Sequence, residues 1–347
     1  MPVLDPHALI DHRVQAIQRY HEETGLERAE LDLSGGIDSA VMAGLLRLAL
    51  GPDKVTLVYS SINSGTETRD RARALAEGIG VPLVIHDLTA TYQTLIDSMI
   101  ANLESAGFDR STVEAGIRAD NTVLGSIRSC IRAPLGRGYL RMTGNGLRHG
   151  TGNECEDRWL RFYQKGGDGE VDSNPIAMLA KGEVFQLAKA LGERLDAEAA
   201  YRSIIEAAPT PELWGAAVSH TDEDEIGSYL GIEHSGESFY SYIDADSGAY
   251  ASVGLIERVA RFVDTPAGAG LFNDGANAAD IDAIIETAQS SPAFEGVAPE
   301  TVERILHAAR RTERTTRHKE NPNCPMLGSR GALVDAGILT DRLPAAR

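Results

Sequence analysis

Ser34-Gly35-Gly36-Ile37-Asp38-Ser39 is the stretch that decides the fold, because it stands between a predicted strand and a predicted helix. Residues 29–33, directly before it, have the length and the apolar alternation of a short strand. Behind it, a segment rich in Ala and Leu continues as a helix to about Leu50, and Gly51-Pro52 ends it. The chain is therefore predicted to turn from strand to helix over two adjacent glycines.

The alternation of strands and helices continues on both sides of this turn. Residues 55–59 and 82–86 predict two more strands, residues 68–78 predict a helix between them, and residues 7–24 predict an amphipathic helix. Strands that alternate with helices form βαβ units and a parallel sheet with right-handed crossovers. We therefore predict an α/β fold with a Rossmann-like, doubly wound parallel sheet and flanking helices. Ligands bind such sheets at the carboxyl ends of the strands, where Ser34 lies.

The remainder of the chain is more helical. Residues 124–137 and 178–191 predict helices, whereas residues 231–252 show no clear period. The last third carries an apolar stripe at helical spacing. We predict a core of residues 1–235 and a helical C-terminal region of residues 236–347, joined as one integrated domain.

Composition and charge restrict the classes of partner. Lys and Arg together number 33 and Asp and Glu 51, so the formal net charge is −18, which repels nucleic-acid phosphates and predicts no nucleic-acid partner. The acidic run 222–225 is interpreted as the first turn of a surface helix. The three cysteines form no CxxC pair, which is typical of free thiols in a reducing compartment. No signal peptide and no apolar run of about 18 residues is found, so we expect a cytoplasmic protein without a membrane partner.

The glycine turn has the chemistry of a phosphate-binding loop. Glycines let the backbone approach a phosphate, and the helix N-terminus adds free N–H groups and a favourable dipole. Ser34 and Ser39 can add hydroxyl donors, whereas Asp38 would repel a phosphate unless Mg²⁺ bridges the two anions. The loop lacks both the GK[ST] ending of a Walker A motif and the GxGxxG spacing of a dinucleotide fingerprint. A bare Gly-Gly turn would also suit a simple connection, so the complete string carries the prediction.

The string Ser-Gly-Gly-x-Asp-Ser at a strand-to-helix junction resembles the PP-loop of ATP pyrophosphatases, which cleave ATP between the α and β phosphates. Further motifs follow in a fixed order: Gly150-Thr151-Gly152-Asn153-Glu154-Cys155-Glu156, Lys165-Gly166-Gly167-Asp168-Gly169 with Asp172, Pro175 with Leu179 and Lys181, Pro209-Thr210-Pro211-Glu212-Leu213-Trp214, Thr221-Asp222-Glu223-Asp224-Glu225-Ile226-Gly227, and His318-Lys319. Their order is similar to that in ammonia-dependent NAD synthetase, over about residues 10–235 and 315–325.

This resemblance implies a reaction in two steps. The carboxylate of the acid substrate, deamido-NAD in this family, attacks the α-phosphorus of ATP, which releases pyrophosphate and leaves an acyl-adenylate. Ammonia then displaces AMP and forms an amide. The resemblance also implies Mg²⁺ as cofactor and a homodimer with the acid-binding site at its interface.

The resemblance also implies roles for individual residues. For catalysis these are Asp38, Glu156, Lys181 and Thr210, and the metal-associated acids among them are Asp38 and Glu156. For ATP binding they are Ser34, Gly35, Gly36, Asp38, Ser39, Thr151, Lys181, Thr210 and Lys319. For binding the acid substrate and shaping the ammonia site they are Arg128, Arg132, Lys165, Asp168, Asp172 and His318. We therefore expect the C-terminal region to return Lys319 to the active site.

One stretch departs from the family pattern. NAD synthetases usually carry Asn-x-(Gln or Lys)-x-Arg-x-Arg on the helix before the Gly-Thr motif. In the corresponding residues 126–132 only Arg132 keeps its place, and Ser126, Arg128 and Cys130 are substitutions. The basic side chain of Arg128 can still bind a phosphate or a carboxylate.

Two further departures affect the acid-binding side. Ala207 and Ala208 stand where the family has a lysine, and Arg148 and His149 stand where apolar strand residues are normal. The motifs on the ATP side are intact. An amide ligase of the same type that acts on another carboxylic acid is therefore the alternative to NAD synthetase proper.

Other classes fit less well. Only 33 residues precede Ser34, too few for the nitrilase-like domain of glutamine-dependent relatives, so ammonia, free or supplied by a partner, is the expected nitrogen donor. Asp38 and Glu156 argue against a nucleotide sensor without catalysis. The net charge of −18 and the lack of paired cysteines argue against a tRNA-modifying enzyme with a PP-loop.

Overall fold

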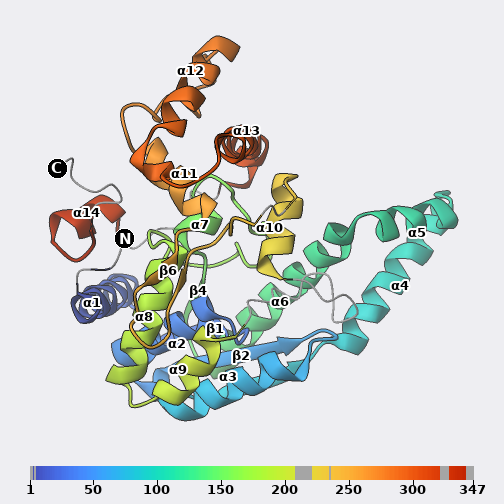
Figure 1. Ribbon diagram of the computed structural model, residues 1–347. Helices are drawn as coiled ribbons and strands as arrows, with labels where there is room; N and C mark the ends of the chain where they lie inside the picture. The colour runs from blue at the N-terminus through green and yellow to red at the C-terminus, as the bar shows by residue number, and fades with distance from the viewer. Residues whose placement is uncertain (1–2, 4, 208–220, 234–235, 321–327, 341–347) are drawn as a thin grey trace.

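The computed structural model describes residues 3, 5–207, 221–233, 236–320 and 328–340. A four-stranded parallel sheet with the order β3-β2-β1-β4 lies at the centre of the described part (Figure 1). Its strands are β1 (Arg28–Asp32), β2 (Val55–Ser61), β3 (Leu83–Asp87) and β4 (Gly146–His149). Because β1 has β2 on one side and β4 on the other, the predicted doubly wound arrangement is confirmed.

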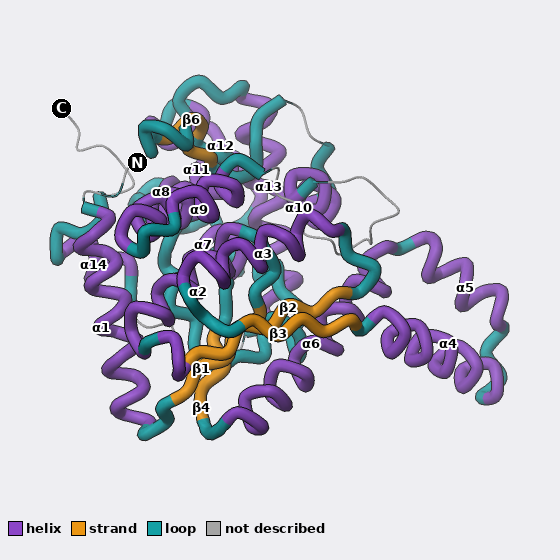
Figure 2. The backbone as a smooth tube through the Cα atoms, turned by 90° about the horizontal axis from the view of Figure 1, so that it is seen from below, coloured by secondary structure: helices purple, strands orange, loops and turns teal. Residues whose placement is uncertain are grey.

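Helices cover both faces of this sheet. One face packs through a large apolar core against α1 (Pro6–Thr24), α2 (Ile37–Leu50), α3 (Thr66–Ile79), α8 (Lys181–Arg194) and α9 (Glu198–Ile205). The opposite face is crossed by α6 (Asn121–Thr143) (Figure 2). The short turn η1 (Pro52–Lys54) joins α2 to β2. The strands and helices that the sequence predicts here are confirmed, with small shifts of their ends.

A pair of helices leaves the body of the molecule between β3 and α6. These helices, α4 (Thr89–Ser105) and α5 (Arg110–Ala119), form an arm that projects away from the sheet (Figure 1). A small apolar cluster that includes Ile62, Tyr92 and Ile96 anchors the base of the arm.

The C-terminal part is helical, as predicted. Its elements are α10 (Asp222–Leu230), β5 (Tyr242–Ile243), β6 (Tyr250–Ser252), α11 (Leu255–Val263), α12 (Ala278–Gln289), η2 (Pro292–Phe294), α13 (Pro299–Thr316), η3 (Arg317–Lys319) and α14 (Arg330–Asp335). A second apolar core packs the helices α10 to α13 against Trp159 and Leu160, next to the short helix α7 (Glu154–Asp157). The boundary at residue 235 stays a prediction. None of the helices in the described ranges has the length and apolarity that crossing a membrane requires.

The sheet face under α6 is polar, which the sequence did not indicate. Glu30 and Arg148 are register partners on β1 and β4, and both are buried. Arg148 Nη1 donates to Glu30 Oε2 over 2.8 Å, and Nη2 donates to Asp32 Oδ2. Gly136 of α6 makes room for this guanidinium, because a Cβ there would lie 1.6 Å from Arg148 Nη1. One arginine therefore binds two carboxyl groups of β1, the buried Glu30 and the partly exposed Asp32.

His149, the second unusual residue of β4, is also satisfied inside the fold. Its Nε2 lies 3.0 Å from His21 Nε2, and its Nδ1 lies 2.8 Å from Ser173 Oγ. Burial lowers the pKa of His149 to about 3, so the ring is neutral. Both polar residues at the apolar strand positions therefore have structural partners.

The shared arginine makes stability depend on the ionisation of Glu30. Burial, together with repulsion from Asp32, raises the pKa of Glu30 to about 8 against the attraction of Arg148. An unfolded Glu titrates near pH 4.3. The stabilisation by this proton is thus complete below that pH and is lost as the pH rises through 8, which weakens the folded state by about 3 kcal/mol between pH 6 and 9.

We expect Glu30→Gln to remove this alkaline loss, because glutamine stays neutral. Denaturant unfolding at pH 6 and pH 9 measures it as the change in the free energy of unfolding. Glu27→Gln, at an exposed carboxylate just before β1, is the matched control and should behave as the wild type. Equal losses in the wild type and in Glu30→Gln would show that Glu30 is ionised throughout this range.

Candidate active site

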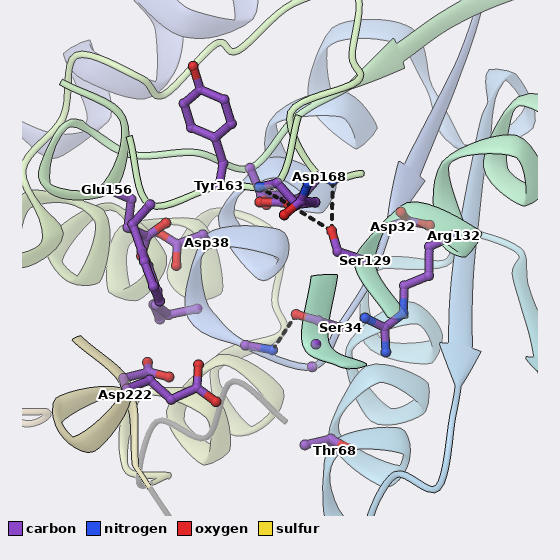
Figure 3. Close-up of a pocket in the computed structure, with 18 of the residues that line it drawn as sticks. Asp32, Ser34, Asp38, Thr68, Ser129, Arg132, Glu156, Tyr163, Asp168 and Asp222 are labelled. Atoms are coloured by element: carbon purple, nitrogen blue, oxygen red, sulfur yellow. Dashed lines mark hydrogen bonds between the residues drawn. The ribbon is translucent and has the colours of Figure 1, made fainter. Parts of the chain in front are cut away.

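A cavity of about 550 Å³ opens at the carboxyl ends of the sheet strands. It lies where α2, α6, α8 and α10 approach one another, and Figure 3 shows part of its lining. Most of the residues singled out from the sequence contribute to its wall: Ser34, Gly35, Gly36, Asp38, Arg132, Thr151, Glu156, Asp168, Lys181 and Lys319. The fold thus brings together side chains that are separated by almost 300 positions in the chain.

The turn between β1 and α2 requires glycine at position 35. Gly35 has a φ of +83°, and a Cβ there would lie 2.3 Å from the carbonyl oxygen of Thr68. Arg71 Nε donates to the Gly35 carbonyl over 3.3 Å, which fixes the loop from the side of α3. The backbone of the loop is therefore held close to a neighbouring helix.

Two serine hydroxyls stabilise the same loop from inside. Ser34 Oγ lies 3.0 Å from Ser39 Oγ and accepts from the Gly36 N–H over 3.2 Å. Ser39 Oγ donates to the Gly36 carbonyl over 3.0 Å and is buried behind the loop, outside the cavity wall. The N-terminus of α2, which has Gly36 as its N-cap, therefore faces the cavity with its N–H groups available for an anion.

Lys181 joins the two predicted acids. Its Nζ donates to Asp38 Oδ2 over 2.6 Å and to Glu156 Oε1 over 2.9 Å, and Asn153 Nδ2 donates to the other oxygen of Asp38 over 2.9 Å. Burial opposes the charge of Lys181, but attraction by both carboxylates raises its pKa well above the usual value. Burial raises the pKa of Glu156 to about 7, and the charge of Asp38 adds to this effect.

Asp38 and Glu156 fit a magnesium ion that takes most of its ligands from a substrate. Mg²⁺ prefers oxygen ligands and usually binds one or two carboxylates together with phosphates and water. Within the described ranges, no three His, Cys, Asp or Glu residues group closely enough to hold a metal by themselves. The two carboxylates thus suit an ion that arrives with a polyphosphate.

The loop with Asp168 is held against α6. Ser129 Oγ donates to Asp168 Oδ1 over 2.6 Å and accepts from the Asp168 N–H over 3.0 Å. The Gln164 N–H donates to the same carboxylate oxygen over 2.9 Å. Asp168 therefore enters the cavity wall with its orientation fixed (Figure 3).

Lys319 reaches the cavity from the end of α13. Its Nζ donates to the carbonyls of Arg161 and Tyr163 over 3.2 and 3.1 Å, and it lies 5.3 Å from the centre of the Tyr229 ring. Burial lowers the pKa of Lys319. The C-terminal region thus returns a lysine to the cavity, where its ammonium group is held by backbone carbonyls.

Four residues assigned to the acid substrate do not line the cavity. Arg128 is buried and donates to the Ile62 carbonyl. Asp172 pairs with Arg137 over 2.6 Å, and Lys165 and His318 are exposed. Their substrate-binding roles stay predictions.

Thr210, assigned to ATP, lies outside the described residues. Its roles in ATP binding and catalysis therefore stay predictions as well.

Other lining residues were missed. Thr221 caps α10, which confirms the predicted helix start, but Asp222 and Glu225 line the cavity and Glu225 is buried, so the interpretation of this run as surface was wrong. Its dense charge after the Pro209 motif was the available signal. Asp32 and Arg71 also line the cavity, and no local pattern marks them.

Comparisons with known proteins agree with this geometry. The family described as NAD synthase matches residues 9–243. An NH(3)-dependent NAD(+) synthetase of Halobacterium salinarum is 32% identical over 225 residues, which cover 63% of this chain and 74% of the relative. The corresponding protein of Alkaliphilus oremlandii is 29% identical over 238 residues, which cover 68% of this chain and 82% of the relative.

A solved structure shares the fold. NMN synthetase from Francisella tularensis aligns with a TM-score of 0.59 and 20% sequence identity, over 92% of this chain and 97% of that chain. Since the family match extends from α1 through the PP-loop, the Gly-Thr motif and Lys181 to β5, this chain belongs to the NAD synthase family and is a ligase that forms a carbon–nitrogen bond.

Proposed function

We propose that the chain uses ATP and ammonia to amidate a carboxylate by way of an acyl-adenylate, with deamido-NAD as the acid and NAD as the product. The observation that carries this proposal is the cluster of Asp38, Lys181 and Glu156 beside the N-terminus of α2. Cations and N–H groups on one side of the cavity suit a departing pyrophosphate. The family membership supports the same reaction.

The first step is attack of the acid carboxylate on the α-phosphorus of ATP. Negative charge grows on the oxygen that bridges the α and β phosphates as that bond breaks, and groups placed there lower the barrier. The N–H groups after Gly36 and the ammonium of Lys181 are suited to this charge. Magnesium, when bound at Asp38 and Glu156, would neutralise phosphate oxygens and raise the acceptor character of the phosphorus.

The second step is attack of ammonia on the acyl carbon. The new C–N bond forms as the bond to AMP breaks, and the nitrogen loses a proton. Asp168, fixed by Ser129, and Asp222 both face the cavity and can hold an ammonium ion or accept that proton. For Asp168, these roles agree with the part in shaping the ammonia site that the family resemblance implies.

Fewer observations support the identity of the acid substrate. Arg132 lines the cavity and makes no ion pair with an acid in the described residues, so it is available for a carboxylate or a phosphate of the substrate. By contrast, Arg128 donates to the Ile62 carbonyl, and Lys165 is exposed and does not line the cavity. The reduced set of basic groups favours, as a second candidate, the same reaction on another nicotinate-bearing acid.

Turnover assays of the purified chain test both candidates. We expect ATP, Mg²⁺ and ammonium with deamido-NAD to give NAD, AMP and pyrophosphate in equal amounts, resolved by chromatography. Nicotinate mononucleotide is the matched alternative acid, and glutamine in place of ammonium should give no amide. Release of ADP and orthophosphate would contradict the adenylation step, whereas amide formation only from the mononucleotide would select the second candidate.

Asp38→Asn separates chemistry from binding. We expect kcat to fall about 100-fold or more, because the variant loses a charge that orients the metal and Lys181 in the transition state. The KM for ATP should change by much less. Asp53→Asn, at an exposed position in the turn η1 that follows α2, is the control and should leave both constants unchanged. A normal kcat for Asp38→Asn would remove Asp38 from the mechanism.

We also propose that the chain forms a homodimer through the arm of α4 and α5. Leu95, Met99 and Phe108 on this arm are 39%, 43% and 59% exposed, and exposed apolar side chains that gather on one element mark interaction surfaces. The arm adjoins α6, whose Ser129 and Arg132 line the cavity. A second copy on this arm would therefore lie next to the acid-binding side of the site.

Sedimentation velocity at micromolar concentration tests this assembly. We expect a dimer for the wild type and a shift towards monomer for Phe108→Glu, because a buried unpaired charge opposes association. Met142→Glu is the matched control, since Met142 is 84% exposed at the other end of α6. A monomeric wild type, or equal effects of the two variants, would contradict the proposal.

A further inference from the structure

Asp32 occupies a distinctive place in the cavity wall. It is the last residue of β1, three positions before Gly35, and its side chain is 29% exposed. In Figure 3 it lies on the other side of the cavity from Asp38 and Glu156. Asp32 is therefore separate from the carboxylates that Lys181 holds.

The protein fixes this carboxylate through a buried support. Arg148 Nη2 donates to Asp32 Oδ2, while Nη1 binds Glu30 and Nε donates to the Glu170 carbonyl over 3.2 Å. The Arg148 side chain is only 3% exposed, and Gly136 leaves the space that its guanidinium fills. Asp32 is thus presented to the cavity in one orientation.

Asp32 retains capacity to accept hydrogen bonds. An ionised carboxylate offers about four acceptor positions, and Arg148 occupies one of them. Within the described part, Oδ1 is buried and has no partner, so a hydroxyl from the cavity would reach this carboxylate at Oδ2, which keeps an acceptor position beside Arg148. A negative group at this place repels phosphate and attracts uncharged donors such as hydroxyls.

The position relative to the loop indicates which donors these are. Asp32 lies within about 10 Å of Gly35, because three residues span no more than that. In a nucleotide whose phosphates lie at Gly35 and at the N-terminus of α2, the ribose follows directly after the α-phosphate. In dinucleotide-binding α/β folds a carboxylate at the carboxyl end of the next strand binds ribose hydroxyls near the glycine loop, and Asp32 offers the same group from the strand that leads into the loop.

We propose that Asp32 binds the ribose hydroxyls of ATP and thereby selects ribonucleotides over deoxyribonucleotides. The proposal rests on the proposed function in one respect, since it takes the loop of residues 34–39 to hold the triphosphate. Arg148 acts as a positioning residue, because it orients Asp32 and does not line the cavity.

Comparison of ATP with 2′-deoxy-ATP and 3′-deoxy-ATP tests this selection. For the wild type we expect kcat/KM to fall about 10- to 100-fold when the hydroxyl that binds Asp32 is missing, as for a hydrogen bond to a charged group. Asp32→Ala should raise the KM for ATP by a similar factor, with little change in kcat. The same variant should use ATP and the deoxynucleotide almost equally.

Two further variants keep the test decisive. Asp32→Asn retains the size of the side chain and serves if Asp32→Ala unfolds, and it should lose most of the discrimination. Glu30→Gln is the matched control, because Glu30 binds the same arginine but does not line the cavity. At pH 6, where Glu30 of the wild type holds its proton, Glu30→Gln should keep the wild-type KM for ATP and the wild-type discrimination.

Several results would overturn the proposal. Equal KM changes in Asp32→Ala and Glu30→Gln would show that Asp32 acts only through its ion pair with Arg148 and does not bind the ribose. Discrimination that survives in Asp32→Ala and in Asp32→Asn, or a KM change for the acid alone, would place the ribose elsewhere. Calorimetric titration with Mg²⁺ and each nucleotide makes the same comparison without turnover, so it remains decisive even if no acid yields an amide.

Discussion

The ammonium group of Lys181 holds together two carboxylates that come from distant parts of the chain. Asp38 begins α2 and Glu156 lies in α7, and like charges this close repel strongly in a cavity of low polarity. A lysine at the start of α8 offsets that repulsion and couples three helix ends to one point. The cluster therefore holds Asp38, Glu156 and Lys181 at one place in the cavity wall, beside the N-terminus of α2. Burial raises the pKa of Glu156, and attraction by the two carboxylates raises the pKa of Lys181.

Local patterns predicted the fold because each carries its own physical signal. The strand, the two glycines and the helix that follow one another around Gly35 could be read directly, and the parallel sheet followed from their repetition. Strands β5 and β6 were missed because two or three residues show no period. On the phosphate side, the order of motifs was enough to place Asp38, Glu156 and Lys181 in one site.

The acid-binding side was less predictable, because its residues act through tertiary contacts. Arg128 occupies a motif position, yet its guanidinium finds the Ile62 carbonyl at the end of β2. Arg148 looked like a defect in an apolar strand, but it needs Glu30 opposite and a glycine on α6 to be accommodated. This arrangement needs residues from three separate segments, so the sequence of no single segment predicts it. Asp32 was missed for the same reason, since it stands in no pattern of its own, whereas Asp222 was assigned to the surface although its acidic run was a signal.

The buried arginine links the interior of the sheet to the cavity. Arg148 shares its charge between Glu30, which is sealed under α6, and Asp32, which faces the ligand space. If hydroxyl donors reach Asp32, they stabilise its negative charge and reduce its repulsion of Glu30. The pKa of Glu30 should then fall, and binding should release a proton. Linkage requires the reverse as well, so that ionisation of Glu30 must change the affinity for the ligand by the same factor. If Asp32 binds the nucleotide, the buried polar groups around Arg148 therefore also couple the ionisation of Glu30 to the affinity for that nucleotide.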